Sequence, residues 1–436
     1  MRVLLANYDS RGGVEPLVGL AVRLRELGAE VRVCAPPDEE FARRLAGVGV
    51  PLVPFGRPVR ALMTAPAPPT AGGVPRRAAE LLAEFDTVAE AAEGCDVLVA
   101  TGLLPAAACV RSVADKLGIP YVYASFQSVS LPSPHHPPMA RPGRPLPTDT
   151  TDNRALWEFD ARSADDLFGE VINTHRASVG LPPVARVRDH VFTDRPWLAT
   201  DPVLDPWRSS QPETTAQGTW QEPSPPGPGV VQTGTWIVPD ERPLAAELTA
   251  FLDAGAPPVY VGFGSIAIGG SEDVARACVE AIRAHGRRVI LSRGWAELAV
   301  LDDRDDQGDP DDRDDCFVVG EANHHALFRR VAAVVHHGGA GTTTTATWAG
   351  APQVVVPQGA DQPYFAGRVA DLGIGVAHDG PTPTYESLSA ALKVALAPET
   401  AARAAEVAGM VQPDGATRAA RLLLDTYGGE RPPVRA

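Results

Sequence analysis

The stretch from Val331 to Asp361 constrains the fold of this chain more than any other. It opens with an apolar, β-branched run at Val331 to Val335, short enough for a buried strand, and continues through a glycine-rich turn. A threonine-rich segment then predicts a helix that must stop before Pro352, and a second apolar run follows at Val354 to Val356. Strand, glycine turn, helix and strand is the arrangement by which an α/β protein offers backbone N–H groups and a helix N-terminus to phosphate.

The same alternation occurs in two successive runs, separated by the Pro-, Gly- and Ser-rich segment Ser209 to Gly229. A chain of 436 residues also exceeds what one core usually organises. We therefore expect two Rossmann-like domains facing across a cleft, with the C-terminal helix packing back on the N-terminal domain. The expected division is an N-terminal domain at 1–208, a linker at 209–230, a C-terminal domain at 231–415, and a helix and tail at 416–436.

The first βα unit places a loop where ligands bind in open α/β sheets. Arg2 to Ala6 predicts a strand, the loop from Asn7 to Glu15 follows, and Pro16 is placed to open a helix that ends at Gly28. The Gly-Gly in this loop is also what a tight turn alone would need. Similar reasoning predicts further strands at 30–35, 51–55, 97–100, 121–125, 259–262, 289–291 and 317–319, and helices at 41–47, 77–92, 157–180, 272–285, 364–372, 386–396, 401–411 and 416–427.

Composition excludes several classes of function. The net charge of −15 argues against a nucleic-acid or anionic-membrane surface. The five cysteines lack CxxC spacing, which favours reduced thiols over disulfides or a zinc site. The N-terminus does not read as a signal peptide, and no apolar run approaches the length of a bilayer crossing. We expect a soluble, cytoplasmic protein.

Three segments are harder to interpret. Arg57 to Val74 is rich in Pro, Ala and Gly, and Pro132 to Thr151 is too rich in proline for regular structure, so both predict loops. Asp302 to Asp315 carries nine Asp and two Arg. Its Asp-x-Asp triplets suggest a metal site, but mutual repulsion, Gly and Pro favour a solvated loop, and the spacing is not that of an EF-hand.

The glycine-rich turn from Gly338 to Gly341 is neither a Walker A motif nor GxGxxG. It indicates a close approach of backbone to a ligand, with Thr342 and Thr343 as capping hydroxyls. His337 is placed to donate a charge-assisted hydrogen bond to a phosphate oxygen. The alternative is purely structural: the histidines bond to backbone and the glycines only make the turn.

The residues His337 to Thr342, Gly350 to Gln353, Pro357 and Asp361 to Pro363 together resemble the donor signature of the family 1 glycosyltransferases. The resemblance covers nearly the whole chain and is closest to the bacterial natural-product branch, in particular the enzymes that glycosylate vancomycin-type glycopeptide antibiotics. Other matching segments fall in the expected order: Ser10 to Gly12, Glu15-Pro16, Thr101 to Pro105, Pro202 to Leu204, Gln232 to Gly234, Val261 to Ser265 and Leu291 to Trp295.

The resemblance implies a GT-B fold in which the C-terminal domain binds the nucleotide sugar and the N-terminal domain binds the acceptor. It implies inversion of the anomeric centre in one displacement, with no metal or other cofactor, and a helix N-terminus stabilising the leaving diphosphate. The implied donor residues are Ser265, His337, Gly338, Gly339, Gly341 and Thr342 for the diphosphate, Arg293, Trp295 and Val319 for the nucleoside, and Asp361 and Gln362 for the sugar hydroxyls.

The candidate acceptor residues are Arg11, Thr101, Phe126, His135 and Trp157. Aromatic residues at the ends of helices and strands are also frequent in plain hydrophobic cores.

One position departs from the family. The antibiotic glycosyltransferases usually carry Ser-Arg-Gly-Asp in the first loop, and that Asp is the expected general base, whereas this chain has Gly13. A positioned base contributes about 10²–10⁴-fold to such a transfer. Either Asp9 substitutes, or the acceptor is an acidic phenol, or the chain transfers poorly; Ser10 and Glu15 lie in the same loop.

The sequence thus predicts an inverting glycosyltransferase that moves a hexose or deoxyhexose from a UDP- or TDP-sugar to a natural-product aglycone, and that acts as a monomer without nucleic-acid or membrane partners. Two alternatives are a sterol or lipid glucosyltransferase of the same superfamily, and a weakly active nucleotide-sugar-binding homologue. The nucleotide base, the sugar and the acceptor hydroxyl stay open.

Overall fold

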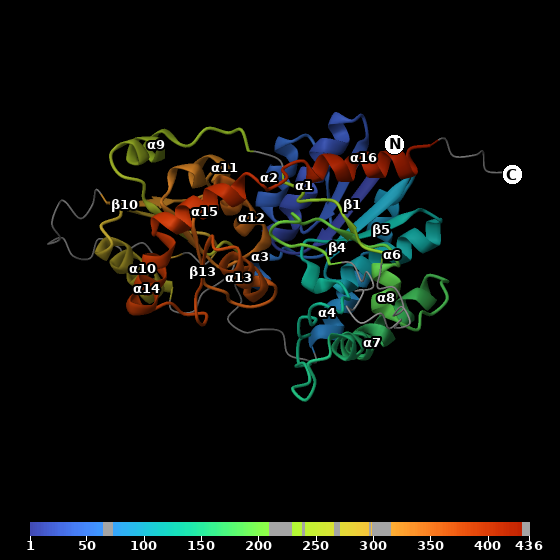
Figure 1. Cartoon of the computed structure of the whole chain (residues 1–436). Helices are drawn as coiled ribbons and strands as arrows, with labels where there is room; N and C mark the ends of the chain where they lie inside the picture. The colour runs from blue at the N-terminus through green and yellow to red at the C-terminus, as the bar shows by residue number, and fades with distance from the viewer. Residues whose placement is uncertain are drawn as a thin grey trace, which may run out of the picture.

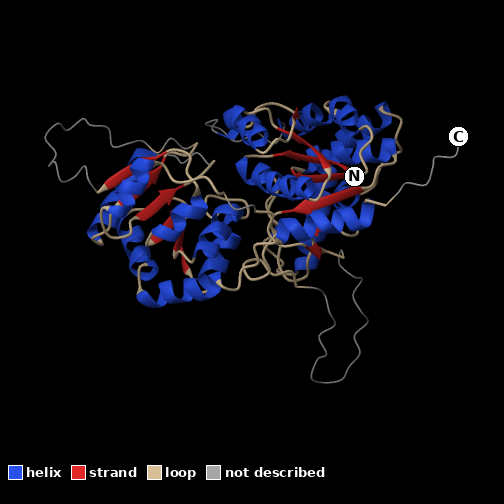
Figure 2. Cartoon of the chain, turned by 90° about the horizontal axis from the view of Figure 1, so that it is seen from above, coloured by secondary structure: helices blue, strands red, loops and turns tan. Residues whose placement is uncertain are grey.

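The chain folds into two lobes, each built on a parallel sheet with helices on both faces (Figures 1 and 2). A computed structural model describes residues 1–63, 73–208, 229–237, 240–265, 271–295, 298 and 315–429. Within these ranges no helix combines the length and apolarity that a membrane crossing requires.

The N-terminal sheet has seven strands in the order β3-β2-β1-β4-β5-β6-β7, and every pairing is parallel. Its strands are β1 (Arg2–Tyr8), β2 (Glu30–Ala35), β3 (Leu52–Pro54), β4 (Val97–Gly102), β5 (Tyr121–Ser125), β6 (Trp197–Leu198) and β7 (Val231–Gln232). Its helices are α1 (Arg11–Glu26), α2 (Glu39–Gly47), α3 (Arg60–Met63), α4 (Gly73–Leu82), α5 (Phe85–Ala92), α6 (Leu104–Leu117), α7 (Asn153–Ser178) and α8 (Val187–Phe192).

The C-terminal sheet has six strands in the order β10-β9-β8-β11-β12-β13, again all parallel. Its strands are β8 (Val259–Gly262), β9 (Val289–Ser292), β10 (Cys316–Val319), β11 (Ala333–His336), β12 (Gln353–Val355) and β13 (Gly375–Ala377). The helices of this half of the chain are α9 (Ala246–Asp253), α10 (Ser271–Ala284), α11 (His324–Leu327), α12 (Ala340–Ala349), α13 (Gln362–Asp371), α14 (Tyr385–Ala395), α15 (Pro398–Ala408) and α16 (Gly415–Tyr427).

Alternate residues of the buried strands point to opposite faces of the C-terminal sheet. Val259 and Val261 pack with the apolar residues of α10 and α14. Tyr260, between them, packs on the other face with residues of α9, α11 and α12. Near-continuous apolar strands covered on both faces are what a parallel sheet requires.

In each sheet the strand order reverses in the middle, between β1 and β4 in one domain and between β8 and β11 in the other. The loops that leave the carboxyl ends of these strand pairs diverge to opposite faces, and the crevice between them is where open α/β sheets bind ligands. The fold therefore places Asp9 and Thr101 at one crevice, and Gly264 and His337 at the other.

The C-terminal helix α16 returns to the N-terminal domain, as expected. It runs beside α1 (Figure 1), and Ala416, Ala419, Ala420 and Leu423 join the core of that domain. The two domains are thus joined both through the connector and through this returning helix.

Three expected boundaries were wrong. The helix expected to open at Pro16 begins at Arg11, because the Ser10 carbonyl already accepts the N–H groups of Gly13 and Val14 (3.0 and 3.3 Å). The helix expected at 77–92 is two helices, of which α4 packs on α7 and α5 packs on α6.

The third correction concerns the domain boundary. Strand β7, which we expected to begin the C-terminal domain, pairs with β6 in the N-terminal sheet. Trp236 follows it into the N-terminal core and is fully buried. Most of the expected linker, and residues 302–314 of the acidic run, lie outside the described residues.

Candidate functional site

Three loops at the carboxyl ends of C-terminal strands lie in close contact. The Trp295 N–H donates to the Gly264 carbonyl (2.8 Å). A Cβ at Gly294 would lie 2.5 Å from that carbonyl oxygen, and a Cβ at Gly264 would lie 2.8 Å from Cε1 of His337. Both glycines have positive φ, 53° and 63°. Only glycine therefore lets the loops after β8, β9 and β11 close to this distance.

The N-terminus of α12 is left open for a ligand. Its N-cap is Gly339, which has no side chain to cap the helix. Four of the five threonine hydroxyls of α12 are occupied, because each donates to the carbonyl four residues back: Thr343, Thr344, Thr345 and Thr347, at 2.7 to 3.0 Å. The first N–H groups of the helix and the positive end of its dipole thus form an anion site.

His337 stands over this helix start. Its Nδ1 is buried and has no hydrogen-bond partner among the described residues. Burial lowers the pKa of His337 to about 4, so the ring is neutral at pH 7. A Cβ at position 339 would lie 2.5 Å from its Nε2, so Gly339 is what allows the ring to occupy this place.

The neighbouring His336 is structural. Its Nε2 pairs with Oε1 of Gln353 (2.9 Å), and its Nδ1 accepts the Gly338 N–H (3.1 Å). Burial, with His337 nearby, lowers its pKa to about 3. The Gly338 N–H is thus engaged within the turn, which its φ of 94° helps to shape.

The loop before α13 carries the residues expected to bind sugar hydroxyls. Ala360 holds a left-handed φ of 54°, which is costly for a residue with a side chain. Gln362 accepts the Gln358 N–H through Oε1 (2.7 Å). Burial, and then the charges of Asp9 and Asp205, raise the pKa of Asp361 to about 7.

Across the interface lies the loop between β1 and α1. The Ser10 N–H donates to Oδ1 of the half-buried Asp9 (2.6 Å). Burial raises the pKa of Asp9, which the backbone and hydroxyl of Ser10 partly offset. Asn7, at the end of β1, donates through Nδ2 to Oγ1 of Thr101 (2.7 Å). Thr101 is only 1% exposed, so it holds Asn7 rather than contacting an acceptor directly.

Several expected ligand residues are engaged elsewhere. Arg11 pairs with Glu321 of the other domain (2.9 Å) and with Glu15 (3.6 Å). Trp295, 7% exposed, packs against Phe41 of the N-terminal domain at a centroid distance of 6.4 Å. These residues join the two domains in this structure.

The remaining donor residues differ in exposure. Arg293 is exposed, and Val319 belongs to the core of the C-terminal domain. Ser265 and Thr342 are half-buried, and Gly341 is exposed at the start of α12.

Among the candidate acceptor residues, the histidine that packs with the aromatic residues is His136 and not His135. His135 is exposed, whereas the His136 ring lies edge-on to Trp157 (5.9 Å) and to Trp207 (6.1 Å). Nε1 of Trp157 donates to the His136 carbonyl (2.9 Å). Phe126 is half-buried and packs against Trp236 (5.8 Å).

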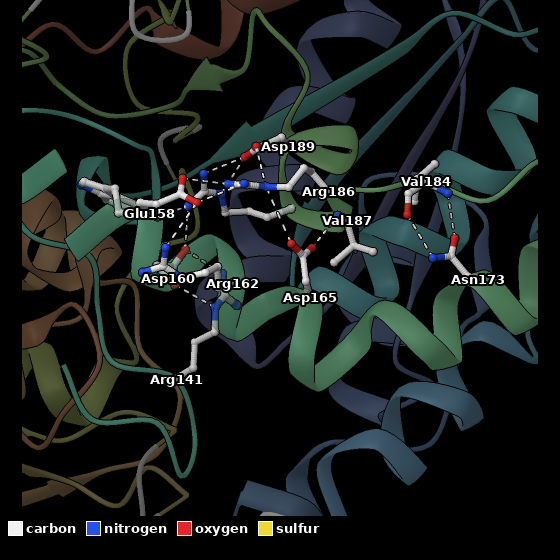
Figure 3. Close-up of polar contacts among 12 residues, drawn as sticks. Arg141, Glu158, Asp160, Arg162, Asp165, Asn173, Val184, Arg186, Val187 and Asp189 are labelled. Atoms are coloured by element: carbon white, nitrogen blue, oxygen red, sulfur yellow. Dashed lines mark hydrogen bonds and ion pairs between the residues drawn. The ribbon is translucent and has the colours of Figure 1, made fainter. Parts of the chain in front are cut away.

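The proline-rich loop that carries these histidines is held by buried ion pairs. Asp160, on α7, pairs with Arg141 of the loop (2.7 Å) and with Arg188 (3.0 Å). Figure 3 shows Arg141 reaching Asp160 beside the ion pairs of Glu158 and Arg186. Sequence reasoning left this loop without structure, because its anchors are distant in the chain.

Sequence reasoning also missed a fully buried carboxylate between the domains. Asp205 is 0% exposed, accepts the Ser128 N–H (2.8 Å) and accepts the Tyr364 hydroxyl of α13 (2.7 Å). Arg368 donates to the Leu204 carbonyl (2.9 Å). The only available signal was the matching segment Pro202 to Leu204, which ends one residue earlier.

Within the described part of the chain, no group of three or more His, Cys, Asp or Glu side chains is arranged to hold a metal. The groups that can meet an anion at this site are the positive end of the α12 dipole and the neutral His337 ring, which carries one N–H.

Comparisons with known proteins agree with this geometry. Residues 12–169 match the glycosyl transferase 4-like domain, and residues 301–417 match the C-terminal domain of erythromycin biosynthesis protein CIII-like proteins. The chain is 57% identical to glycosyltransferase GtfE and 56% identical to vancomycin aglycone glucosyltransferase of Amycolatopsis orientalis. It is 51% identical to dTDP-epi-vancosaminyltransferase of the same organism, and all three alignments cover 100% of both chains.

Solved structures show the same fold at low identity. The glycotransferase of kitacinnamycin aligns with a TM-score of 0.66 at 20% identity, over 98% of this chain and 99% of that one. The calicheamicin glycosyltransferase CalG4 aligns with a TM-score of 0.65 at 18% identity, over 99% of both chains. The chain belongs to the family 1 glycosyltransferases of GT-B fold, in the group that includes the vancomycin-type glycopeptide glycosyltransferases, and is a nucleotide-sugar-dependent glycosyltransferase.

Proposed function

We propose that this enzyme transfers a hexose or deoxyhexose from a UDP- or TDP-sugar to a hydroxyl of a glycopeptide-type aglycone, with inversion at the anomeric carbon. The open N-terminus of α12, overhung by the neutral His337 with its unpartnered Nδ1, is the observation that carries this proposal. A diphosphate supplies the negative charge and the acceptor oxygens that both groups require.

The donor would lie with its diphosphate on α12 and its sugar toward Asp361 and Gln362. The Gly338 backbone approaches Gln362 closely, since a Cβ at position 338 would lie 3.2 Å from Cβ of Gln362. The sugar site therefore adjoins the diphosphate site. An acceptor arriving from the N-terminal domain would face the anomeric carbon opposite the leaving group, which is the geometry that inversion needs.

The relatives support the substrate class. One is named for the vancomycin aglycone and a glucosyl group, another for a TDP-linked epi-vancosaminyl group. They differ in sugar, so both neutral and amino sugars are candidates for this chain. We further propose a cytoplasmic, metal-independent monomer.

A mass-spectrometric screen tests the proposal. Wild-type enzyme is incubated with UDP- and TDP-linked glucose and with a TDP-linked amino sugar, against glycopeptide, macrolide and phenolic aglycones. We expect a mass increase of one glycosyl residue on the glycopeptide aglycone, β-configured at C1 by NMR, and undiminished by EDTA. Transfer to macrolide or phenolic aglycones but not to the glycopeptide aglycone would reject the proposed acceptor class. Retention of configuration at the anomeric carbon would reject a single displacement.

A further inference from the structure

We propose that Asp9 is the general base of the transfer, and that position 13 is glycine because the side chains of Asp9 and Asn7 occupy the space that a side chain there would need. This inference rests on the proposed function and names the group that activates the acceptor.

The geometry around Gly13 excludes any Cβ. A Cβ at this position would lie 2.7 Å from Cβ of Asp9, 2.7 Å from Nδ2 of Asn7 and 2.9 Å from Oδ1 of Asn7. Such separations lie far inside van der Waals contact, and Asn7 is too tightly held to move, being 1% exposed and bonded to Thr101. A side chain at position 13 is therefore incompatible with Asn7 and Asp9 in their present places.

Asp9 lies on the side of the interface where a base is needed. The leaving diphosphate belongs to α12 in the C-terminal domain, so an in-line attack brings the acceptor from the opposite, N-terminal side. Asp9 follows β1 of that domain, yet its charge raises the pKa of Asp361 in the sugar-binding loop. Asp9 thus lies at the carboxyl end of β1, at the strand-order switch where α/β sheets bind ligands, and within electrostatic reach of Asp361.

The other carboxylates near the expected acceptor position are engaged in other contacts or lie on the leaving-group side. Both oxygens of Asp205 are taken, by the Ser128 N–H and the Tyr364 hydroxyl. Glu15 is paired with Arg44 (3.0 Å) and Arg11 (3.6 Å). Asp361 immediately precedes α13 and adjoins the diphosphate turn, on the leaving-group side.

A buried acceptor is available for the proton that Asp9 receives. Oδ1 of Asn7 has no hydrogen-bond partner within the described ranges, although it is buried. A neutral carboxylic acid has an O–H donor that a carboxylate lacks. Burial without a partner is unfavourable, and a hydrogen bond from the protonated Asp9 would relieve it.

The transfer is a single displacement at C1 of the sugar. The acceptor O–H bond breaks and its proton passes to a carboxylate oxygen of Asp9. The freed electron pair of the acceptor oxygen forms a bond to C1 of the sugar. The bond from C1 to the diphosphate oxygen breaks, and the nucleoside diphosphate leaves with that electron pair.

The first test is Asp9→Asn, which keeps an oxygen for the Ser10 N–H. With TDP- or UDP-glucose and the vancomycin aglycone, we expect kcat to fall by about 10²–10⁴-fold. The affinity for free TDP or UDP and the melting temperature should stay close to wild type. A variant that keeps at least half of the wild-type kcat would overturn the assignment of Asp9.

The pH profile separates Asp9 from its titrating neighbours, which are Asp361 on the opposing loop and Tyr123 on β5. Wild-type kcat/KM should fall on the acid side as the base becomes protonated. Asp361→Asn should retain this acid limb and Asp9→Asn should lose it. The reverse pattern would move the base to Asp361.

The steric half of the proposal is tested by moving the carboxylate. Gly13→Asp alone should lose activity and stability. Gly13→Asp combined with Asn7→Ala and Asp9→Gly, which remove the atoms that its Cβ would meet, should be at least ~10-fold more active than Asn7→Ala with Asp9→Gly, since a positioned base is worth ~10²–10⁴-fold. Equal activity of Gly13→Asp and wild type would refute the exclusion. If the wild type transfers only to water, the same variants are compared on donor hydrolysis; if it does neither, the proposed function and the base both fail.

Discussion

Two buried polar regions of this enzyme contrast in how their groups are paired. Beneath the proline-rich loop, Asp160 is bonded to both Arg141 and Arg188. At the interdomain site, Oδ1 of Asn7 and Nδ1 of His337 have no partner in the described chain. An unpaired buried group costs about 1–3 kcal/mol, so it persists where a ligand completes it. Buried atoms without a partner among the described residues also occur elsewhere, such as Nε2 of His136. It is their position at the carboxyl ends of β1 and β11 that connects Asn7 and His337 with ligand binding.

The largest expected effect comes from breaking the paired region. Asp160→Asn removes the charge that balances Arg141 and Arg188, so we expect a loss of about 3–5 kcal/mol in the free energy of unfolding, measured in urea. The control is Glu158→Gln in the half-exposed pair with Arg186, where about 1 kcal/mol or less is expected. Equal losses would contradict the distinction between buried and surface pairs.

A smaller effect, on activity and not on folding stability, is expected from a change beside the unpaired His337. Gly339→Ala would place a Cβ 2.5 Å from Nε2 of His337 and push the ring off α12. Displacing a group of the active site by about 1 Å can lower the rate by about 10²-fold. We therefore expect kcat/KM to fall by about that factor, while the free energy of unfolding changes by about 1 kcal/mol or less. Gly367→Ala is the control, because nothing lies within 4 Å of its Cβ; similar losses in the two variants would count against the His337 site.

The burial of Asp361 should make the free energy of unfolding depend on pH. Its pKa is raised from 3.8 to about 7, so the folded state binds the proton more tightly and loses stability as pH rises between these values. We expect Asp361→Asn to stabilise the fold by about 1–3 kcal/mol at pH 8 and by little near pH 4, allowing for partial exposure. A gain that does not depend on pH would show that the charge is not the cause.

The smallest effect on stability is expected from removing a single hydrogen bond between the domains, donated by an uncharged hydroxyl. Tyr364→Phe deletes the hydroxyl that donates to Asp205 and should cost about 1 kcal/mol in thermal unfolding. Tyr385→Phe, at an exposed tyrosine, is the matched control. A larger loss would make this contact a main support of the interface.

Much of the fold follows from local pattern. The apolar runs at β5 and β8 and the glycine after α6 are visible in sequence, and these elements lie where expected. What could not be foreseen depends on residues distant in the chain. β7 joins the N-terminal sheet by pairing with β6, although it follows the connector.

The candidate site was predictable to the level of loops, but not of atoms. The glycine turn pointed to α12, yet the adjacent His336 and His337 look alike in sequence. Only the structure shows that His336 is tied to Gln353 while His337 is unpaired. The steric conflict among Asn7, Asp9 and a side chain at position 13 likewise needs distances, because three residues close in sequence carry no signal of mutual exclusion.

The most direct test of the account is calorimetric titration of TDP and UDP into the wild type and into His337→Phe, with the melting temperature of each. Phe fills the same space without the unpaired nitrogen, so we expect affinity for the nucleotide to fall more than ~10-fold while stability is equal or higher. Unchanged affinity together with reduced stability would contradict it, because His337 would then serve the fold and not the diphosphate.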